Sequence, residues 1–118
     1  MYISDSLALA ALEQFVHLGR AAIRLRFVSF RVEVPDRVAM EVFDRGRLPK
    51  DWRAEPPPDS TKDIGTAWAE RGAGALLKVP SVLVPVEYNF ILNPAHPDFG
   101  RLVIRNPEPF SFDPRMWK

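Results

Sequence analysis

Residues 79–94, VPSVLVPVEYNFILNP, constrain the fold most, because apolar positions alternate there and Pro80 and Pro85 fall within seven residues of its start. One parity carries only apolar and aromatic side chains: Val82, Val84, Val86, Tyr88, Phe90 and Leu92. The other parity carries Ser81, Leu83, Pro85, Glu87 and Asn89. This pattern predicts a β-strand with its first face on the core. Its second face either presents a hydroxyl, a carboxylate and an amide to a site, or faces solvent, with Pro85 marking an edge strand.

Residues 5–18, DSLALAALEQFVHL, form the clearest predicted helix. Ser4 or Asp5 can cap its start, and Gly19 can end it in the left-handed conformation. Apolar side chains cover most of its circumference, which predicts a helix buried on most sides. The polar remainder is one narrow stripe: Ser6, Glu13, Gln14 and His17.

Glu13 on this stripe has two interpretations. It is either an exposed helix glutamate or a partly desolvated carboxylate that faces a cleft. In the second case His17, one turn later, is a candidate hydrogen-bond partner. The pattern alone leaves both interpretations open.

The remaining elements predict an α+β fold. RLRFVSFRVEVP is a predicted strand with a bulge near Val28, and RVAMEVFD a second one with Val38, Met40 and Val42 inward. The Pro35-Asp36 turn would join them as an antiparallel pair. Further predicted strands are the opening segment, GALLKVP and, as the last one, RLVIR.

Between these strands lie a loop and a second helix. Residues 45–59 form a predicted loop that Trp52 anchors, and STKDIGTAWAERG a short helix. Ser60 would cap this helix, and Ile64, Ala67 and Trp68 would face inward. The order of elements predicts one domain with a mixed, mostly antiparallel sheet and a few short helices.

Composition excludes several classes of function. With 118 residues and a net charge of +1, the chain favours neither nucleic acid nor a membrane surface as a partner. It has no cysteine and only two histidines, without metal-ligand spacing, so we expect no metal site. Its start does not read as a signal peptide, which fits a cytoplasmic protein. NPAHPDFG is predicted to be a structural corner.

Six segments carry a family resemblance, in order along nearly the whole chain: YISDSLALAALEQFVHL, VEVPD, LPKDWR, IGTAWAERGAGALLKVPS, VPVEYNFILNPAHPDF and PFSFDPR. They resemble the RES-domain proteins, the toxins of bacterial RES–Xre toxin–antitoxin pairs. The resemblance implies a fold similar to ADP-ribosyltransferase toxins. It also implies cleavage of the nicotinamide–ribose bond of NAD, with phosphate, water or a protein as the acceptor.

The resemblance also assigns site residues. Glu13 and Ser81 match the catalytic glutamate and serine of the family, and Tyr2 and Ser4 match its Y-x-S segment. All four are expected to contact NAD. Glu13 would stabilise positive charge on the ribose, Tyr2 would orient the nicotinamide, and Ser81 would hydrogen-bond a ribose or phosphate oxygen.

The family arginine, which would pair with the pyrophosphate, lies in a GGRWN-like segment without a counterpart in this chain. The chain thus corresponds to an N-terminally truncated RES domain over residues 1–118, with slow NAD turnover or none. The alternative is a non-catalytic RES module that only binds an Xre-type antitoxin, or a decayed remnant. The implied partner is a helix-turn-helix antitoxin of the Xre family. The chain would form a hetero-oligomer with this antitoxin or a homo-oligomer with copies of itself.

Overall fold

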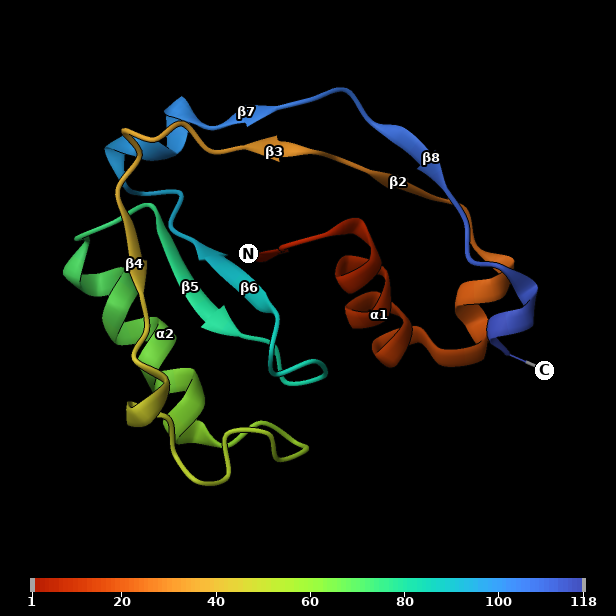
Figure 1. Ribbon diagram of the computed structural model, residues 1–118, viewed down its shortest axis with the longest axis horizontal. Helices are drawn as coiled ribbons and strands as arrows, with labels where there is room; N and C mark the ends of the chain where they lie inside the picture. The colour runs from red at the N-terminus through yellow and green to blue at the C-terminus, as the bar shows by residue number, and fades with distance from the viewer. Residues whose placement is uncertain (1, 118) are drawn as a thin grey trace.

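A four-stranded sheet forms the centre of the computed structural model, which describes residues 2–117 (Figure 1). Its strand order is β1-β6-β5-β4, with β4 parallel to β5 and the other neighbours antiparallel. The strands are β1 (Tyr2–Ser4), β4 (Met40–Val42), β5 (Leu76–Pro80) and β6 (Tyr88–Leu92). The predicted α+β fold with a mixed, mostly antiparallel sheet is confirmed.

Helix α2 (Asp59–Arg71) covers one face of this sheet, and its Trp68 is buried. It ends at Gly72, whose φ of 65° is the left-handed conformation that glycine adopts without strain. The predicted Ser60 cap is wrong, because the helix begins one residue earlier, after the extended Pro58. Ala67 was expected to face inward but is exposed.

Helix α1 (Leu7–Leu18) stands beside the sheet rather than within the core (Figure 1). Its cap is Ser6, whose hydroxyl accepts the N–H of Leu9 at 3.1 Å, and not Ser4 or Asp5, because Ser4 belongs to β1. Gly19 ends the helix with a φ of 56°. The expected burial on most sides is wrong: of this helix only Leu9 is fully buried, because the helix packs along one side alone. A 3-10 helix, Gly19–Arg24, follows.

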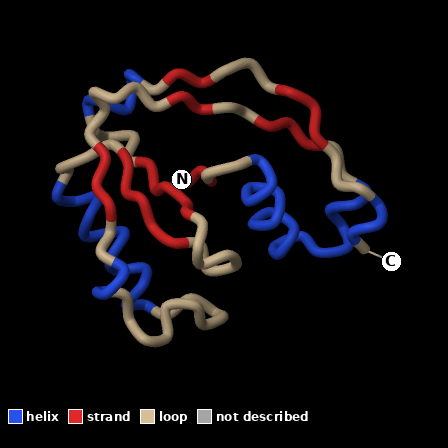
Figure 2. The backbone as a smooth tube through the Cα atoms, in the orientation of Figure 1, coloured by secondary structure: helices blue, strands red, loops and turns tan. Residues whose placement is uncertain are grey.

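An antiparallel ribbon arches from α1 to the sheet (Figure 2). It consists of two short sheets, in which β2 (Phe27–Ser29) pairs with β8 (Glu108–Phe110) and β3 (Val32–Glu33) with β7 (Val103–Ile104). The predicted strand is interrupted between β2 and β3, after the bulge that was expected near Val28. The segment RLVIR is followed by β8, a strand that was not predicted. The arch makes the molecule open: its radius of gyration is 15.4 Å, above the roughly 13.5 Å expected for a compact domain of this length.

The predicted antiparallel pair of residues 24–35 and 37–44 does not form. A turn in which Val38 donates to the carbonyl of Pro35 at 3.0 Å redirects the chain to the edge of the central sheet, where β4 pairs with β5. Val38 is buried as expected, whereas Met40 and Val42 are exposed, because that end of their sheet face has no helix over it.

Residues 81–87 are the loop of the β5–β6 hairpin, so the predicted long strand is wrong over this part. Ser81 donates its N–H to the carbonyl of Glu87 at 2.9 Å, and Glu87 donates to Val84 at 2.8 Å. Pro85, which has no N–H to give to a ladder, lies in this loop, and Val86 is 83% exposed.

The core lies where β4, β5 and β6 meet the end of the ribbon. Its buried members are Val38, Ala75, Leu76 and Leu92. NPAHPDFG forms the predicted corner: Asp98 accepts the N–H of Ala39 at 3.0 Å, and the 3-10 helix Pro97–Arg101 follows His96. Further 3-10 turns are Arg45–Arg47 and Pro114–Met116. Across residues 2–117, no helix has the length and apolar character that crossing a membrane requires.

Candidate functional site

The candidate site lies on the sheet face that α2 covers. Paired strand residues share a face, so the pairs Tyr2–Ile91 and Val79–Asn89 both belong to it. A Cβ atom added to Gly65 of α2 would lie 3.7 Å from Cδ1 of Ile91, which places α2 over this face. The second turn of α1 approaches the same face from the side and brings Glu13 to it.

Two donors hold one oxygen of the Glu13 carboxylate. The hydroxyl of Ser81 and Nδ2 of Asn89 each donate to Oε1 at 2.8 Å. Asn89 is itself fixed, because its Oδ1 accepts the hydroxyl of Ser4 at 2.6 Å. No hydrogen bond to Oε2 forms among residues 2–117, so this oxygen is free for a ligand.

The predicted proximity of Glu13 and Ser81 is confirmed, but Ser81 does not line an open cleft. Its side chain is fully buried, and its hydroxyl also accepts the N–H groups of Leu83 and Val84, both at 3.1 Å. A serine hydroxyl has one proton to donate and two lone pairs. All three are in use, so the geometry lets Ser81 position Glu13 and the hairpin loop rather than contact a ligand.

A cavity of about 370 Å³ opens in front of Glu13. Its wall is mostly apolar and comes from the sheet, from α2, from α1 and from the loop that follows the 3-10 turn Arg45–Arg47; Phe43, Trp52, Ile64, Val79, Leu83 and Ile91 are among its members. Apolar concave sites with a few fixed polar groups are the usual form of small-molecule sites, which measure roughly 300–1,000 Å³.

Tyr2 and His17 line this cavity together with Glu13. Tyr2 is half-exposed, as expected for a residue at the rim. Burial of its ring, and secondly the negative charge of Glu13, raise the pKa of the Tyr2 phenol above its usual value. The candidate hydrogen bond between His17 and Glu13 does not form in the described part of the chain, where the carboxylate accepts bonds from Ser81 and Asn89, both at Oε1.

The sequence left the role of Asn89 open, and the structure makes it the second donor to Glu13. The signal was present, because Asn89 has the parity of Ser81 in the segment 79–94. The sequence did not predict the apolar wall of the cavity. Of its members named above, Trp52 had been singled out, but only as the anchor of its loop.

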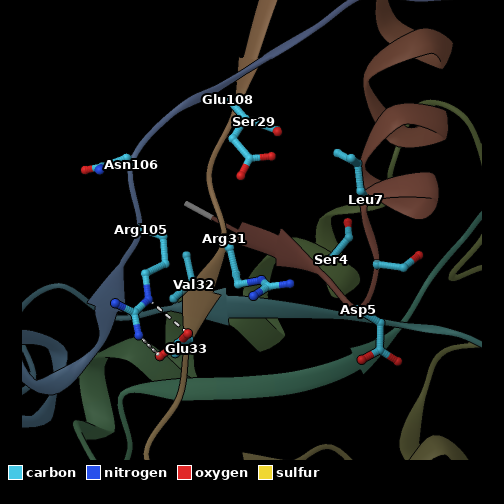
Figure 3. Close-up of a pocket in the computed structure, with 11 residues that line it drawn as sticks. Ser4, Asp5, Leu7, Ser29, Arg31, Val32, Glu33, Arg105, Asn106 and Glu108 are labelled. Carbon is cyan, nitrogen blue, oxygen red and sulfur yellow. Dashed lines mark hydrogen bonds and ion pairs between the residues drawn. The ribbon is translucent and has the colours of Figure 1, made fainter.

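A second, larger cavity of about 820 Å³ lies between the start of α1 and the ribbon (Figure 3). Its lining is mostly polar, and Figure 3 shows Arg31 and Arg105 on the ribbon across from Asp5 and Leu7. Arg105 donates to both oxygens of Glu33, at 2.9 and 2.8 Å, and these bonds lower the pKa of the Glu33 carboxyl. Of the predicted site residues only Ser4 borders this space.

Within residues 2–117, no three histidine, aspartate or glutamate side chains are grouped so that they could hold a metal ion. The Glu13 cavity offers a carboxylate, an amide donor and aromatic side chains to a ligand.

Comparison with known proteins identifies the relatives of this chain. Residues 1–113 match the RES domain. The chain is 42% identical, over 98% of its length and 73% of the relative's, to a Prs ADP-ribosylating toxin of Sphingobium sp. (strain YBL2). It is 38% identical to a Toxin Res of Yersinia enterocolitica (98% and 76% covered) and 30% identical to a Toxin Res of Pseudomonas putida (99% and 79% covered).

Proposed function

The chain belongs to the RES domain family, and we propose that it is an NAD-consuming toxin whose reaction takes place in the Glu13 cavity. One observation carries this proposal: the Glu13 carboxylate has one oxygen held by Ser81 and Asn89 and the other free, beside an apolar cavity. A fixed negative charge in a site that excludes water stabilises positive charge more strongly than the same group in solution. The names of the relatives, an ADP-ribosylating toxin and Toxin Res, support the same reading.

The proposed step breaks the bond between nicotinamide and C1′ of its ribose. The bonding electrons leave with the nicotinamide, which becomes neutral, and the ribose takes on the character of an oxocarbenium ion. Glu13 stabilises this cation as it develops. An oxygen of the acceptor then forms the new bond to C1′ and gives up its proton. The acceptor is phosphate, water or a protein side chain, and ADP-ribosylation is what the name of the Sphingobium relative states.

The other residues of the site take supporting roles in this proposal. Tyr2 at the rim and Trp52 in the wall offer aromatic faces for the nicotinamide ring. Ser81 and Asn89 keep the Glu13 carboxylate in one orientation, and Ser4 fixes the amide of Asn89. A carboxylate held in advance need not reorganise as the charge develops.

The proposed partner is an antitoxin, because the relatives carry toxin names. We expect an Xre-type helix-turn-helix protein in the bacterial cytoplasm, where NAD is available. A purely binding role, without turnover, is the alternative that the following experiment decides.

Purified protein is incubated with NAD, with and without phosphate, over hours, and nicotinamide and the adenine-containing products are separated by chromatography. We expect slow loss of NAD with release of nicotinamide, at a rate that Glu13→Gln lowers roughly 100- to 1,000-fold. The matched control is Glu70→Gln, an exposed glutamate of α2, which should keep the full rate.

The products identify the acceptor: ADP-ribose for water, its phosphorylated form for phosphate, and labelled protein for transfer to a side chain. Equal rates for Glu13→Gln and the parent would contradict the proposed site. Binding of the antitoxin without any loss of NAD would establish the binding-only role.

A further inference from the structure

Arg53 is an exposed arginine beside the wall of the Glu13 cavity. Its Nε donates to the carbonyl oxygen of Val82 at 2.8 Å, and Val82 lines the cavity. Its chain neighbours Trp52 and Ala54 line the cavity as well. The guanidinium is therefore fixed at the rim, between the loop that carries Trp52 and the hairpin loop that begins at Ser81.

Two turns hold the backbone on either side of Arg53. Trp52 donates its N–H to the carbonyl of Pro49 at 3.1 Å, and Ala54 donates to Asp51 at 2.9 Å. Among residues 2–117, the two terminal nitrogens of Arg53 form neither a hydrogen bond nor an ion pair. The side chain is held through Nε alone, and the other N–H donors of its fork are free for a ligand.

The charges inside the cavity show why a cation at the rim matters. Within the described chain the ionisable lining residues are Tyr2, Glu13, His17 and Glu55, without any lysine or arginine. A dinucleotide carries two negative charges on its diphosphate, which would be repelled by Glu13 and Glu55. Since the cavity of about 370 Å³ holds only part of such a ligand, the diphosphate would extend to the rim.

We propose that Arg53 binds the diphosphate of the dinucleotide and thereby determines that the site accepts a dinucleotide rather than a nicotinamide nucleoside. This rests on the proposed function of the Glu13 cavity. The planar guanidinium matches two phosphate oxygens at once, which a lysine ammonium cannot do. The resemblance assigns the pyrophosphate to an arginine of the family's GGRWN-like segment, which has no match among residues 1–118. Arg53, in contrast, is one of these 118 residues and lies beside the proposed site.

A purely structural role for Arg53 is the competing explanation, since its bond to Val82 also ties down the hairpin loop. Arg45 provides the comparison, because its Nη2 donates to the carbonyl of Pro85 in the same loop. Its guanidinium lies over the ring of Tyr88, whose position in β6 puts that ring on the other face of the sheet. Arg45 thus ties the same loop without reaching the rim.

The experiment measures the affinity of NAD and of nicotinamide riboside, which has no phosphate, by calorimetric titration. The parent protein carries Glu13→Gln, so that the ligands are not consumed. We expect Arg53→Ala to weaken NAD binding about 10- to 100-fold and to leave nicotinamide riboside binding nearly unchanged. Arg53→Lys should recover part of the NAD affinity, and Arg45→Ala should keep the NAD-to-riboside affinity ratio of the parent.

Each other outcome overturns the proposal. Equal weakening of both ligands by Arg53→Ala would mean that Arg53 only ties the loop. The same selective loss in Arg45→Ala would mean that NAD responds to net charge rather than to a contact. If the parent binds both ligands and Arg53→Ala changes neither, Arg53 has no role in binding. If the parent binds neither, the proposed function fails, and this inference fails with it.

Discussion

The Glu13 cavity and the larger, polar cavity beside the ribbon differ in the way their charged side chains are held. In the smaller one, a carboxylate accepts two bonds from a buried hydroxyl and a buried amide, and apolar side chains surround it. In the larger one, Arg105 and Glu33 pair with each other and are both well exposed to water. An ion pair that is exposed to water attracts a charged ligand only weakly, because its two charges neutralise each other and water screens them. In this protein, the volume of a cavity is therefore a poor indicator of a functional site. The hydrogen bonds that hold a single functional side chain in place are a better indicator.

The packing below each cavity explains this difference. The Glu13 cavity rests on four paired strands with a helix above them and a buried core behind them. The polar cavity lies under a ribbon only two strands wide, whose Val28, Phe30 and Ile104 are 57%, 55% and 60% exposed. Two-stranded ribbons are marginally stable by themselves. The Glu13 cavity therefore has the more extensively packed support of the two.

The largest effect we expect is on stability, from matched aliphatic truncations in the two regions. Leu76→Ala removes a fully buried side chain of the core and should lower the free energy of unfolding by about 2–5 kcal/mol. Ile104→Ala on the ribbon, where the side chain is mostly exposed, should change it by less than about 0.5 kcal/mol. Urea denaturation measures both. Similar losses for the two variants would mean that the ribbon is covered in solution and would remove the contrast.

The next effect concerns two serines, one that holds Glu13 and one at the polar cavity. Ser81→Ala leaves the N–H groups of Leu83 and Val84 without their partner and frees one side of Glu13. It should cost about 1–3 kcal/mol of stability and lower NAD turnover about 10-fold. Ser29→Ala, at the polar cavity, should alter neither by a measurable amount. Full NAD turnover in a stably folded Ser81→Ala protein would show that Glu13 does not need this hydroxyl.

A smaller effect is expected from the ion pair at the polar cavity. The bonds from Arg105 lower the pKa of Glu33 below its usual value of 4.5, so the unfolded chain takes up this proton first as the pH falls. The stabilisation by Glu33 is therefore present above pH 4.5 and is lost as the pH falls through the folded pKa. Glu33→Gln should lower the melting temperature slightly at pH 7, and by less as the pH falls through the folded pKa of Glu33 or as the salt concentration rises, and it should leave NAD turnover unchanged. A reduced turnover would give the polar cavity a role in the reaction.

Local patterns in the sequence predicted the elements better than their pairing. Both helices were predicted to within two residues of their ends, although not with their N-caps, because apolar periodicity and the glycines at their ends are local signals. The parallel pairing of β4 with β5 was missed, since contacts between distant segments leave no local pattern. The alternation of residues 82–86 was misleading, because the hydroxyl of Ser81 and the proline at 85 turn the backbone there.

The site was predictable in part for a similar reason. The resemblance brought Glu13 and Ser81 together, and the shared parity of Ser81 and Asn89 placed both on one side of their segment. That Ser81 would be buried and fully hydrogen-bonded did not follow from the sequence, because it depends on the loop conformation and on the approach of α1. The position of Arg53 depends on the same loop.

The smallest effect we expect is on the pKa of Tyr2, which tests whether the Glu13 charge acts on a side chain at the cavity rim. Burial and then Glu13 raise the pKa of Tyr2 above 10.0, so that Tyr2 keeps its proton at neutral pH and its stabilising contribution is lost only as the pH rises beyond that value. The chain has two tyrosines, so Tyr88→Phe leaves Tyr2 as the one phenol to follow by near-ultraviolet absorbance. In that background Glu13→Gln should lower the pKa of Tyr2 toward 10.0 without reaching it, because burial is the larger cause. Glu33→Gln, which removes a carboxylate at the polar cavity, should leave the pKa of Tyr2 unchanged. An unchanged pKa of Tyr2 in Glu13→Gln would mean that the Glu13 charge does not influence the phenol at the cavity rim. The proposed role of Tyr2 in orienting a cationic nicotinamide beside Glu13 would then lose its support.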